Sequence, residues 1–266
     1  MKRLLTASAL GLCLNTFANA ASPQTADRKS KACAECTEMV VVPAGSYLMG
    51  SAVLDVASNP KAWQPNTDEL PQHNVFLKSF GLGKYEVTQD QWFAVMGSVP
   101  SFNRGGTLPV ETVSWNDVQK FIAKLNEKTG QNYRLPTESE WEYAARAGSS
   151  TAFSFGDDPA QLDQYAWYSD NSGKKAHPVG EKVPNKFGLY DMHGNVWEWV
   201  QDCYAPTYVA APADGSAVPE RPGCERVIRD GSGVDFPKSL RAAERYKNNP
   251  DYSNGNLGFR LALTLP

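Results

Sequence analysis

Glu198 is the residue whose neighbours first suggest chemistry. It lies between Trp197 and Trp199, shortly after the pair Gly194–Asn195, which favours a tight turn. A carboxylate between two large aromatic side chains loses much of its hydration and therefore needs a partner. The partner could be an arginine, or a hard cation such as calcium that also binds the exposed carbonyl groups of the turn. The residues alone favour the arginine, because buried charges are usually paired.

The cysteines are the second candidate group. The chain has five, and Cys13 lies in an N-terminal segment that we expect to be removed. The even number that remains predicts disulfides in an exported protein, with Cys203 paired to Cys224 and Cys33 to Cys36. A redox role for Cys33-Ala-Glu-Cys36 would need a βαβ context, and none follows it. A zinc site formed by all four is disfavoured because the second pair is spaced too widely.

Two other polar features have structural explanations. Glu138, Glu140 and Glu142 could be catalytic carboxylates, but they stand near the start of a predicted helix, where acidic residues favour the macrodipole. His73 is one of three histidines, and no other histidine or carboxylate stands at ligand spacing from it. We therefore expect these residues to belong to the scaffold.

The first twenty residues have the composition of a secretory signal peptide. Lys2-Arg3 is a charged start, residues 4–14 are apolar, and Ala18-Asn19-Ala20 is a small-residue cleavage site. The apolar run is too short to span a bilayer, so we expect no transmembrane segment after cleavage. Loss of Lys2 and Arg3 changes the formal net charge from −3 to −5, which gives no support for nucleic-acid binding. The sequence thus predicts a periplasmic or secreted protein.

The remaining chain predicts a polar leader over residues 21–37, which carries Cys33 and Cys36, and one domain over residues 38–266. Capping residues predict three helices, over Thr88–Gly97, Ser114–Gly130 and Thr137–Gly148. β-rich patterns predict a hairpin over 39–48 and a strand over 74–80, separated by a long loop over 51–72. Regular patterns become sparse after Ser149, where short aromatic segments alternate with turns. The expected fold class is α+β and rich in loops.

Several motifs stand in an order that resembles one known family. The match extends from about Glu38 to the C-terminus, and its motifs are Val41-Val42-Pro43-Ala44-Gly45-Ser46, Tyr85-Glu86-Val87-Thr88, Arg134-Leu135-Pro136-Thr137-Glu138, Gly194-Asn195-Val196-Trp197-Glu198-Trp199, Asp230-Gly231-Ser232 and Asn256-Leu257-Gly258-Phe259-Arg260. The chain is identified by them as a member of the formylglycine-generating enzyme family, also called the sulfatase-modifying factor domain. The resemblance implies that family's fold, which is similar to C-type lectins and has calcium sites. Activity is a separate matter, because a fold does not fix a function.

The resemblance implies a structural calcium ion at the stretch that contains Glu198. The family's ligands fall on the backbone carbonyls of His193, Gly194 and Val196 and on the carboxylate of Glu198. With the resemblance included, calcium becomes the expected partner of Glu198. A second family site needs an asparagine where this chain has Trp167, and only Asp170 or Asn171 could substitute for it.

The resemblance fails at the family's copper site. The oxygen-activating members hold copper between two cysteine thiolates after a Gly-Gly-Ser motif, because soft sulfur selects Cu(I). Those positions fall near Asp235 and Leu240, and no cysteine follows Cys224. Copper is therefore not expected, and neither is formylglycine formation.

The family's pocket is only partly retained. Ser232, Arg241 and Trp199 remain as candidate pocket residues, together with Asp235 in a former cysteine position. Asp230 replaces a glycine and Gly233 replaces an aromatic residue, which we expect to open space and to add a carboxylate to the pocket. The sequence leaves open whether these changes remodel a working pocket or reflect drift.

The motifs leave two functional hypotheses. One is a binding or accessory role, with a sugar, a peptide or a partner protein as ligand. The other is a periplasmic oxidoreductase similar to the siderophore-maturation (pyoverdine-type) branch of the family, with a siderophore-like ligand and Asp235 as base. A hydrolase is disfavoured, because His177 and His193 could approach Ser232 only through tertiary structure.

Overall fold

The computed structural model describes residues 36–52 and 63–265. The described residues belong to one compact unit, and the predicted signal peptide and most of the leader lie outside them. Within the described ranges, no helix is long and apolar enough to cross a membrane.

The three predicted helices form, and local capping explains where each begins. Helix α1 (Gln89–Met96) starts after Thr88, α2 (Trp115–Thr129) after Ser114 and α3 (Glu138–Arg146) after Thr137. Each starts with a capping box, in which the cap side chain and the third helical residue exchange hydrogen bonds with each other's backbone. Gly97 and Gly130 end the first two in the left-handed conformation, whereas α3 ends at Ala147, one residue before the expected glycine. A fourth short helix, α4, covers Leu162–Tyr165.

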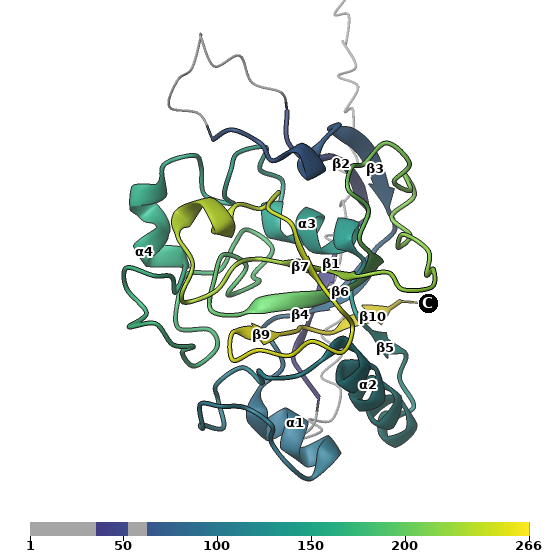
Figure 1. The fold of residues 1–266 in the computed structure, drawn as a ribbon, viewed down its shortest axis with the longest axis vertical. Helices are drawn as coiled ribbons and strands as arrows, with labels where there is room; N and C mark the ends of the chain where they lie inside the picture. The colour runs from purple at the N-terminus through teal and green to yellow at the C-terminus, as the bar shows by residue number, and fades with distance from the viewer. Residues whose placement is uncertain (1–35, 53–62, 266) are drawn as a thin grey trace, which may run out of the picture. The chain divides into compact units, whose positions relative to one another are not determined.

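Two four-stranded sheets and a two-stranded ribbon complete the α+β fold (Figure 1). The first sheet has the order β1-β4-β10-β5, and the sheet that carries the candidate site has the order β8-β7-β6-β9. In the latter, only the pair β6–β9 is parallel. The strands are β1 (Met39–Val42), β2 (Gly45–Met49), β3 (His73–Leu77), β4 (Phe80–Gly83), β5 (Tyr133–Arg134), β6 (Trp197–Cys203), β7 (Arg226–Arg229), β8 (Tyr246–Asn248), β9 (Leu257–Gly258) and β10 (Ala262–Thr264).

The predicted hairpin over residues 39–48 is wrong. β1 pairs with β4 in the first sheet, whereas β2 pairs with β3 in the ribbon. The predicted strand over 74–80 is likewise divided, because Lys78 and Ser79 separate β3 from β4. Pro43 and Ala44 separate the first two strands without folding one back on the other, so the alternating pattern identified extended segments but not their partners.

The carboxylates of α3 belong to the scaffold, but for a different reason from the one expected. Glu138 and Glu142 are buried, and Arg229 bonds both, at 2.6 and 2.8 Å. Arg245 also bonds Glu138 at 2.6 Å. The pKa of Glu138 is lowered although burial alone would raise it, because Arg245 and Arg229 favour its charged form. Buried ion pairs, rather than the helix dipole, therefore account for these residues.

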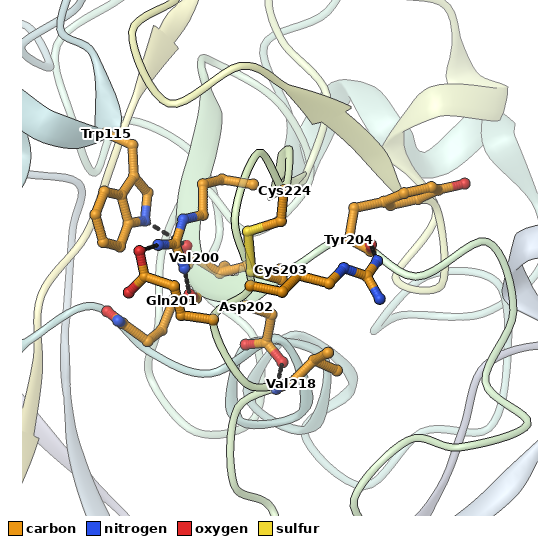
Figure 2. The surroundings of a disulfide bond; sticks show 11 residues. Trp115, Val200, Gln201, Asp202, Cys203, Tyr204, Val218 and Cys224 are labelled. Carbon is orange, nitrogen blue, oxygen red and sulfur yellow. Dashed lines mark hydrogen bonds and ion pairs between the residues drawn. A yellow bond between two sulfur atoms is a disulfide. The ribbon is translucent and has the colours of Figure 1, made fainter.

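Disulfide bonding agrees with the predicted pairing where it can be seen. Cys203, at the end of β6, is bonded to Cys224 with a Cα–Cα distance of 5.6 Å, as Figure 2 shows. Cys36 is also disulfide-bonded, and its predicted partner Cys33 lies outside the described residues. The Cys203–Cys224 bond closes a loop over residues 204–223, which lowers the entropy of the unfolded chain.

Asp202, next to this disulfide, is buried between two backbone donors. Its Oδ1 accepts from Val218 N at 2.7 Å, as Figure 2 shows. Its Oδ2 accepts from Glu138 N, also at 2.7 Å. Burial, with repulsion from Glu138, raises its pKa from 3.8 to about 7. The folded protein therefore keeps a proton on Asp202 at pH values where the unfolded chain has lost it.

We predict that Asp202 makes the protein less stable as pH rises from about 4 to about 7. In that window the folded state binds more protons, so the free energy of unfolding falls by up to about 4 kcal/mol. Asp202→Asn cannot ionise, and its stability relative to wild type should improve over the same window, on top of a constant loss from one hydrogen bond. Urea unfolding of both proteins from pH 4 to 8 measures this. A wild-type-minus-variant difference that does not change with pH would contradict it.

Candidate functional site

Arg260 is the partner of Glu198. Arg260 Nη2 and Nε lie 2.6 and 2.8 Å from Glu198 Oε1, and Nε also lies 2.8 Å from Oε2. Trp141 Nε1 donates to Oε2 at 2.7 Å. Both charged side chains are fully buried. The arginine partner that the residues alone favoured is therefore present.

Three further buried carboxylates surround this pair. Glu86 accepts from Asn195 Nδ2 at 2.8 Å, Asp230 accepts from Gly194 N at 2.6 Å, and Asp191 accepts from Gly180 N at 2.7 Å. Asp191 Oδ1 and Asp230 Oδ2 are buried and have no hydrogen-bond partner in the part of the chain that the structure describes.

Burial dominates the electrostatics of this group. It raises the pKa of Glu86 and of Asp230 well above the ordinary range, and that of Asp191 to about 6. Repulsion between the carboxylates adds to the effect, and Arg260 opposes it. Arg260 is the cation that opposes this effect in all three groups, so the cluster would carry an excess of negative charge if every carboxyl were ionised.

This excess fits a bound cation electrostatically. The side-chain geometry fits less well, because both oxygens of Glu198 are already hydrogen-bonded. Across residues 36–52 and 63–265, no group of three or more His, Cys, Asp or Glu side chains is arranged to hold a metal. A calcium ion here would therefore depend on the carbonyls of His193, Gly194 and Val196 and would share Glu198 with Arg260.

The side chain of His193 is part of the scaffold. Its Nδ1 lies 2.9 Å from the carbonyl of Leu240, and its Nε2 accepts the N–H of Ser154 at 3.0 Å. These contacts place the proton on Nδ1. Burial lowers the pKa of His193 to about 4, so the ring is neutral near pH 7.

The structure brings Ser232 and Asp235 together. Ser232 Oγ donates to Asp235 Oδ2 at 2.5 Å, within a turn in which Asp235 N donates to the carbonyl of Ser232. Trp197 Nε1 donates to the same carboxylate oxygen at 2.8 Å, and Asn256 Nδ2 donates to Ser232 Oγ at 3.2 Å. Ser232 is buried, whereas Asp235 is half-buried. We call these four residues the Ser232–Asp235 site.

Sequence reasoning missed Trp197 and Asn256 as members of this site. Both belong to quoted motifs, so their identities were visible, but their contacts cross between distant segments. Aromatic side chains also lie near the site: the rings of Trp197 and Tyr246 are 6.2 Å apart, and Phe236 follows Asp235 directly and is 70% exposed. The site is thus an ionisable group beside exposed aromatic surface.

Two predicted pocket residues lie elsewhere. Trp199 is fully buried in the hydrophobic core and donates its indole N–H to the carbonyl of Val113 at 3.0 Å. Arg241 pairs with Glu69 at 2.7 Å and with Glu244, and it lines a separate cleft. Neither has a hydrogen bond to Ser232 or Asp235.

The two replaced motif residues do not open the pocket as expected. A Cβ atom on Gly233 would lie 2.7 Å from the carbonyl oxygen of Lys175, so backbone already fills that space. Asp230 is fully buried, with its carboxylate on Gly194 N. That expectation is wrong, because the main chain around the motif has closed over both positions.

The candidates for a second calcium site are used in local hydrogen bonds. Asn171 Oδ1 accepts from Tyr168 N at 2.9 Å, and its Nδ2 donates to Ala166 O at 2.9 Å. Asp170 Oδ1 accepts from Ser169 Oγ at 2.7 Å. Asn171 therefore stabilises its own loop.

Comparison with known proteins identifies the family. The model of the sulfatase-modifying factor enzyme 1-like domain, FGE-sulfatase, matches residues 24–265. Serine/threonine-protein kinase pkn1 of Chlamydia pneumoniae is 31% identical over 258 residues, which are 86% of this chain and 38% of that protein. Formylglycine-generating enzyme of Streptomyces coelicolor is 37% identical over 169 residues, 58% of this chain and 52% of that enzyme. This chain thus spans about half or less of these two relatives.

A solved structure extends the similarity to nearly the whole fold. PvdO from Pseudomonas aeruginosa superposes with a TM-score of 0.78 at 35% identity, covering 88% of this chain and 96% of PvdO. The chain therefore belongs to the FGE-sulfatase family, the sulfatase-modifying factor enzyme 1-like domains.

Proposed function

We propose that this protein is an exported member of the family that binds a ligand at the Ser232–Asp235 site and does not form formylglycine. Its role would be that of a binding or accessory protein in the periplasm or outside the cell. One observation carries the proposal: a carboxylate, Asp235, stands near one of the two positions where the resemblance places the family's copper thiolates, and it is hydrogen-bonded to Ser232.

The state of the cysteines supports the proposal that this chain does not form formylglycine. Cys36, Cys203 and Cys224 are the cysteines of the described residues, and all three are disulfide-bonded. A disulfide sulfur is not a thiolate and does not hold Cu(I) as a thiolate pair does. Leu240, at the second thiolate position, is buried in an apolar cluster and offers no ligand atom.

The hydrogen bonds of Asp235 support the proposed ligand binding. Its Oδ2 accepts hydrogen bonds from Ser232 Oγ and Trp197 Nε1, which fix the orientation of the carboxylate. A carboxylate held in this way is placed to accept a hydrogen bond from a ligand donor. The nearby rings of Trp197 and Tyr246 offer apolar contact area of the kind that ligand sites use.

Calcium is proposed as the structural cofactor of this scaffold. When bound, it would favour the ionised forms of Glu86, Asp191 and Asp230, whose pKa values burial raises, and would share Glu198 with Arg260. The chain's own residues hold this region by the Glu198–Arg260 pair and by the N–H groups that bond Glu86 and Asp230.

Elemental mass spectrometry of the purified mature protein, before and after chelation, tests both parts of this proposal. We expect close to one calcium per chain and no bound copper, with no formylglycine produced from a cysteine-containing peptide in air. A formylglycine-generating enzyme run in parallel serves as the positive control. Stoichiometric copper, or formylglycine in the peptide, would overturn the proposal. Protein that is fully folded and calcium-free would overturn the calcium part alone.

A second candidate function is an oxidoreductase, and the half-buried position of Asp235 would let a substrate reach this carboxylate. In that reaction, Asp235 would remove a proton from a siderophore-like substrate, and molecular oxygen would accept the substrate's electrons. Oxygen uptake with a catechol probe should then be abolished in Asp235→Asn and retained in Lys238→Ala, a change at an exposed residue outside the site. Equal uptake by wild type and Asp235→Asn would eliminate Asp235 as the base.

A further inference from the structure

A second hollow lies away from the Ser232–Asp235 site. It has a volume of about 570 Å³, which is within the range of small-molecule sites. Trp63 forms one wall and packs edge-on against Phe153, with ring centroids 6.3 Å apart. We call this hollow the Trp63 cleft. Trp63 is half-buried, so its indole is supported by the core and still faces the cleft.

Two buried arginines supply donors at the base of the Trp63 cleft. Arg146 is paired with Glu142, and Arg241 with Glu69 and Glu244, so neither leaves an unbalanced charge. Each guanidinium carries five N–H groups. Arg146 uses three of them in hydrogen bonds within the described residues and Arg241 four, so N–H groups remain for a ligand.

Acceptors stand at the rim. Asp157 uses Oδ1 to accept from Ala152 N at 2.8 Å, and Asp158 uses Oδ1 to accept from Ala160 N at 3.0 Å. Their Oδ2 atoms have no hydrogen bond to another described residue, and both side chains are exposed. The rim carboxylates disfavour an anion, and the guanidinium N–H groups, which only donate, suit an acceptor such as a hydroxyl oxygen.

A neighbouring hollow continues the same surface. It has a volume of about 500 Å³ and shares Ser150 and Thr151 with the Trp63 cleft. Phe155 and Tyr165 line it and stack with centroids 4.3 Å apart. The two hollows therefore present an aromatic surface at each end, with hydroxyl groups between them, and suit a ligand longer than one ring.

We propose that the Trp63 cleft and the neighbouring hollow form a binding groove for a neutral oligosaccharide. A sugar hydroxyl both donates and accepts hydrogen bonds, which matches guanidinium donors at the base and carboxylate acceptors at the rim. The C–H face of a sugar ring is apolar and packs against an aromatic face such as that of Trp63. Because the groove does not include Ser232 or Asp235, this inference is independent of the function proposed above.

Calorimetric titration with maltotriose, cellotriose and chitotriose tests the inference. We expect at least one of them to bind saturably, with a Kd of about 1 mM or tighter. Trp63→Ala should weaken that binding at least about tenfold. The double variant Asp157→Asn/Asp158→Asn should weaken it too, and it changes only exposed side chains. Phe102→Ala is the matched control, because Phe102 is 84% exposed and lines neither hollow.

Three outcomes would overturn the inference. They are no binding of any trisaccharide to the wild type, unchanged binding by both groove variants, or loss of binding in Asp235→Asn. The last result would place the sugar at the Ser232–Asp235 site. Retained binding by Asp235→Asn with loss in the groove variants would support the groove even if the function proposed for Ser232–Asp235 failed.

Discussion

Replacement of Arg229 by alanine should lower the free energy of unfolding by about 3–5 kcal/mol, because it leaves two buried carboxylates without their shared partner. Arg229 is fully buried. Its Nη1 bonds Glu138 at 2.6 Å and Tyr208 at 3.2 Å, and its Nη2 bonds Glu142 at 2.8 Å. Arg245 would still pair with Glu138 and Arg146 with Glu142, so each carboxylate would lose one of its two buried arginine partners.

Urea unfolding followed by tryptophan fluorescence measures this loss. Lys247→Ala is the matched control, because Lys247 pairs with Glu225 at 2.6 Å at the surface, where both side chains are over 40% exposed. Surface pairs of this kind contribute about 0–1 kcal/mol. If Arg229→Ala and Lys247→Ala cost the same, the buried pairs of α3 would not be what connects this helix to β7.

Local sequence was sufficient for the helices of this fold. Thr88, Ser114 and Thr137 each bond a backbone N–H three residues ahead, so the signal and the structure it causes lie within one turn. The contact between Ser232 and Asp235 is equally local, since the two residues are three apart in a turn. Such contacts depend on the backbone angles of only a few consecutive residues, so they can be predicted from the local sequence without knowledge of the rest of the fold.

Local sequence did not predict which strands pair with each other or which distant residues meet at the site. The segment 39–49 supplies strands to two sheets, and nothing in its own residues identifies β4 and β3 as their partners. Trp197 reaches Asp235 across 38 residues, and Arg260 reaches Glu198 across 62. The sequence predicted that Glu198 needs a partner, because desolvation is a property of its neighbours. Which arginine meets it depends on the packing of β6 beside β9.

The second large effect concerns that arginine. Arg260→Ala should lower the free energy of unfolding by about 3–5 kcal/mol, since the buried pair with Glu198 is broken from one side only. The variant also removes the donor to the carbonyls of Gly83, Tyr190 and Asp191. Four buried carboxylates would then face one another without a guanidinium.

Added calcium should restore part of the unfolding free energy that Arg260→Ala loses. If calcium binds at the carbonyls beside Glu198, the folded state gains RT ln(1 + [Ca²⁺]/Kd) of stability, and the excess charge in Arg260→Ala should tighten that binding. Urea unfolding of both proteins in calcium and in chelator should therefore show a larger calcium response in the variant. Glu198→Gln is the matched control, because it removes the proposed ligand charge and should reduce the response in either background. A full loss in Arg260→Ala with no calcium response in any protein would leave the ion pair as the structural element of the site and exclude the metal. A loss below about 1 kcal/mol would mean that this pair does not determine the stability of the buried cluster.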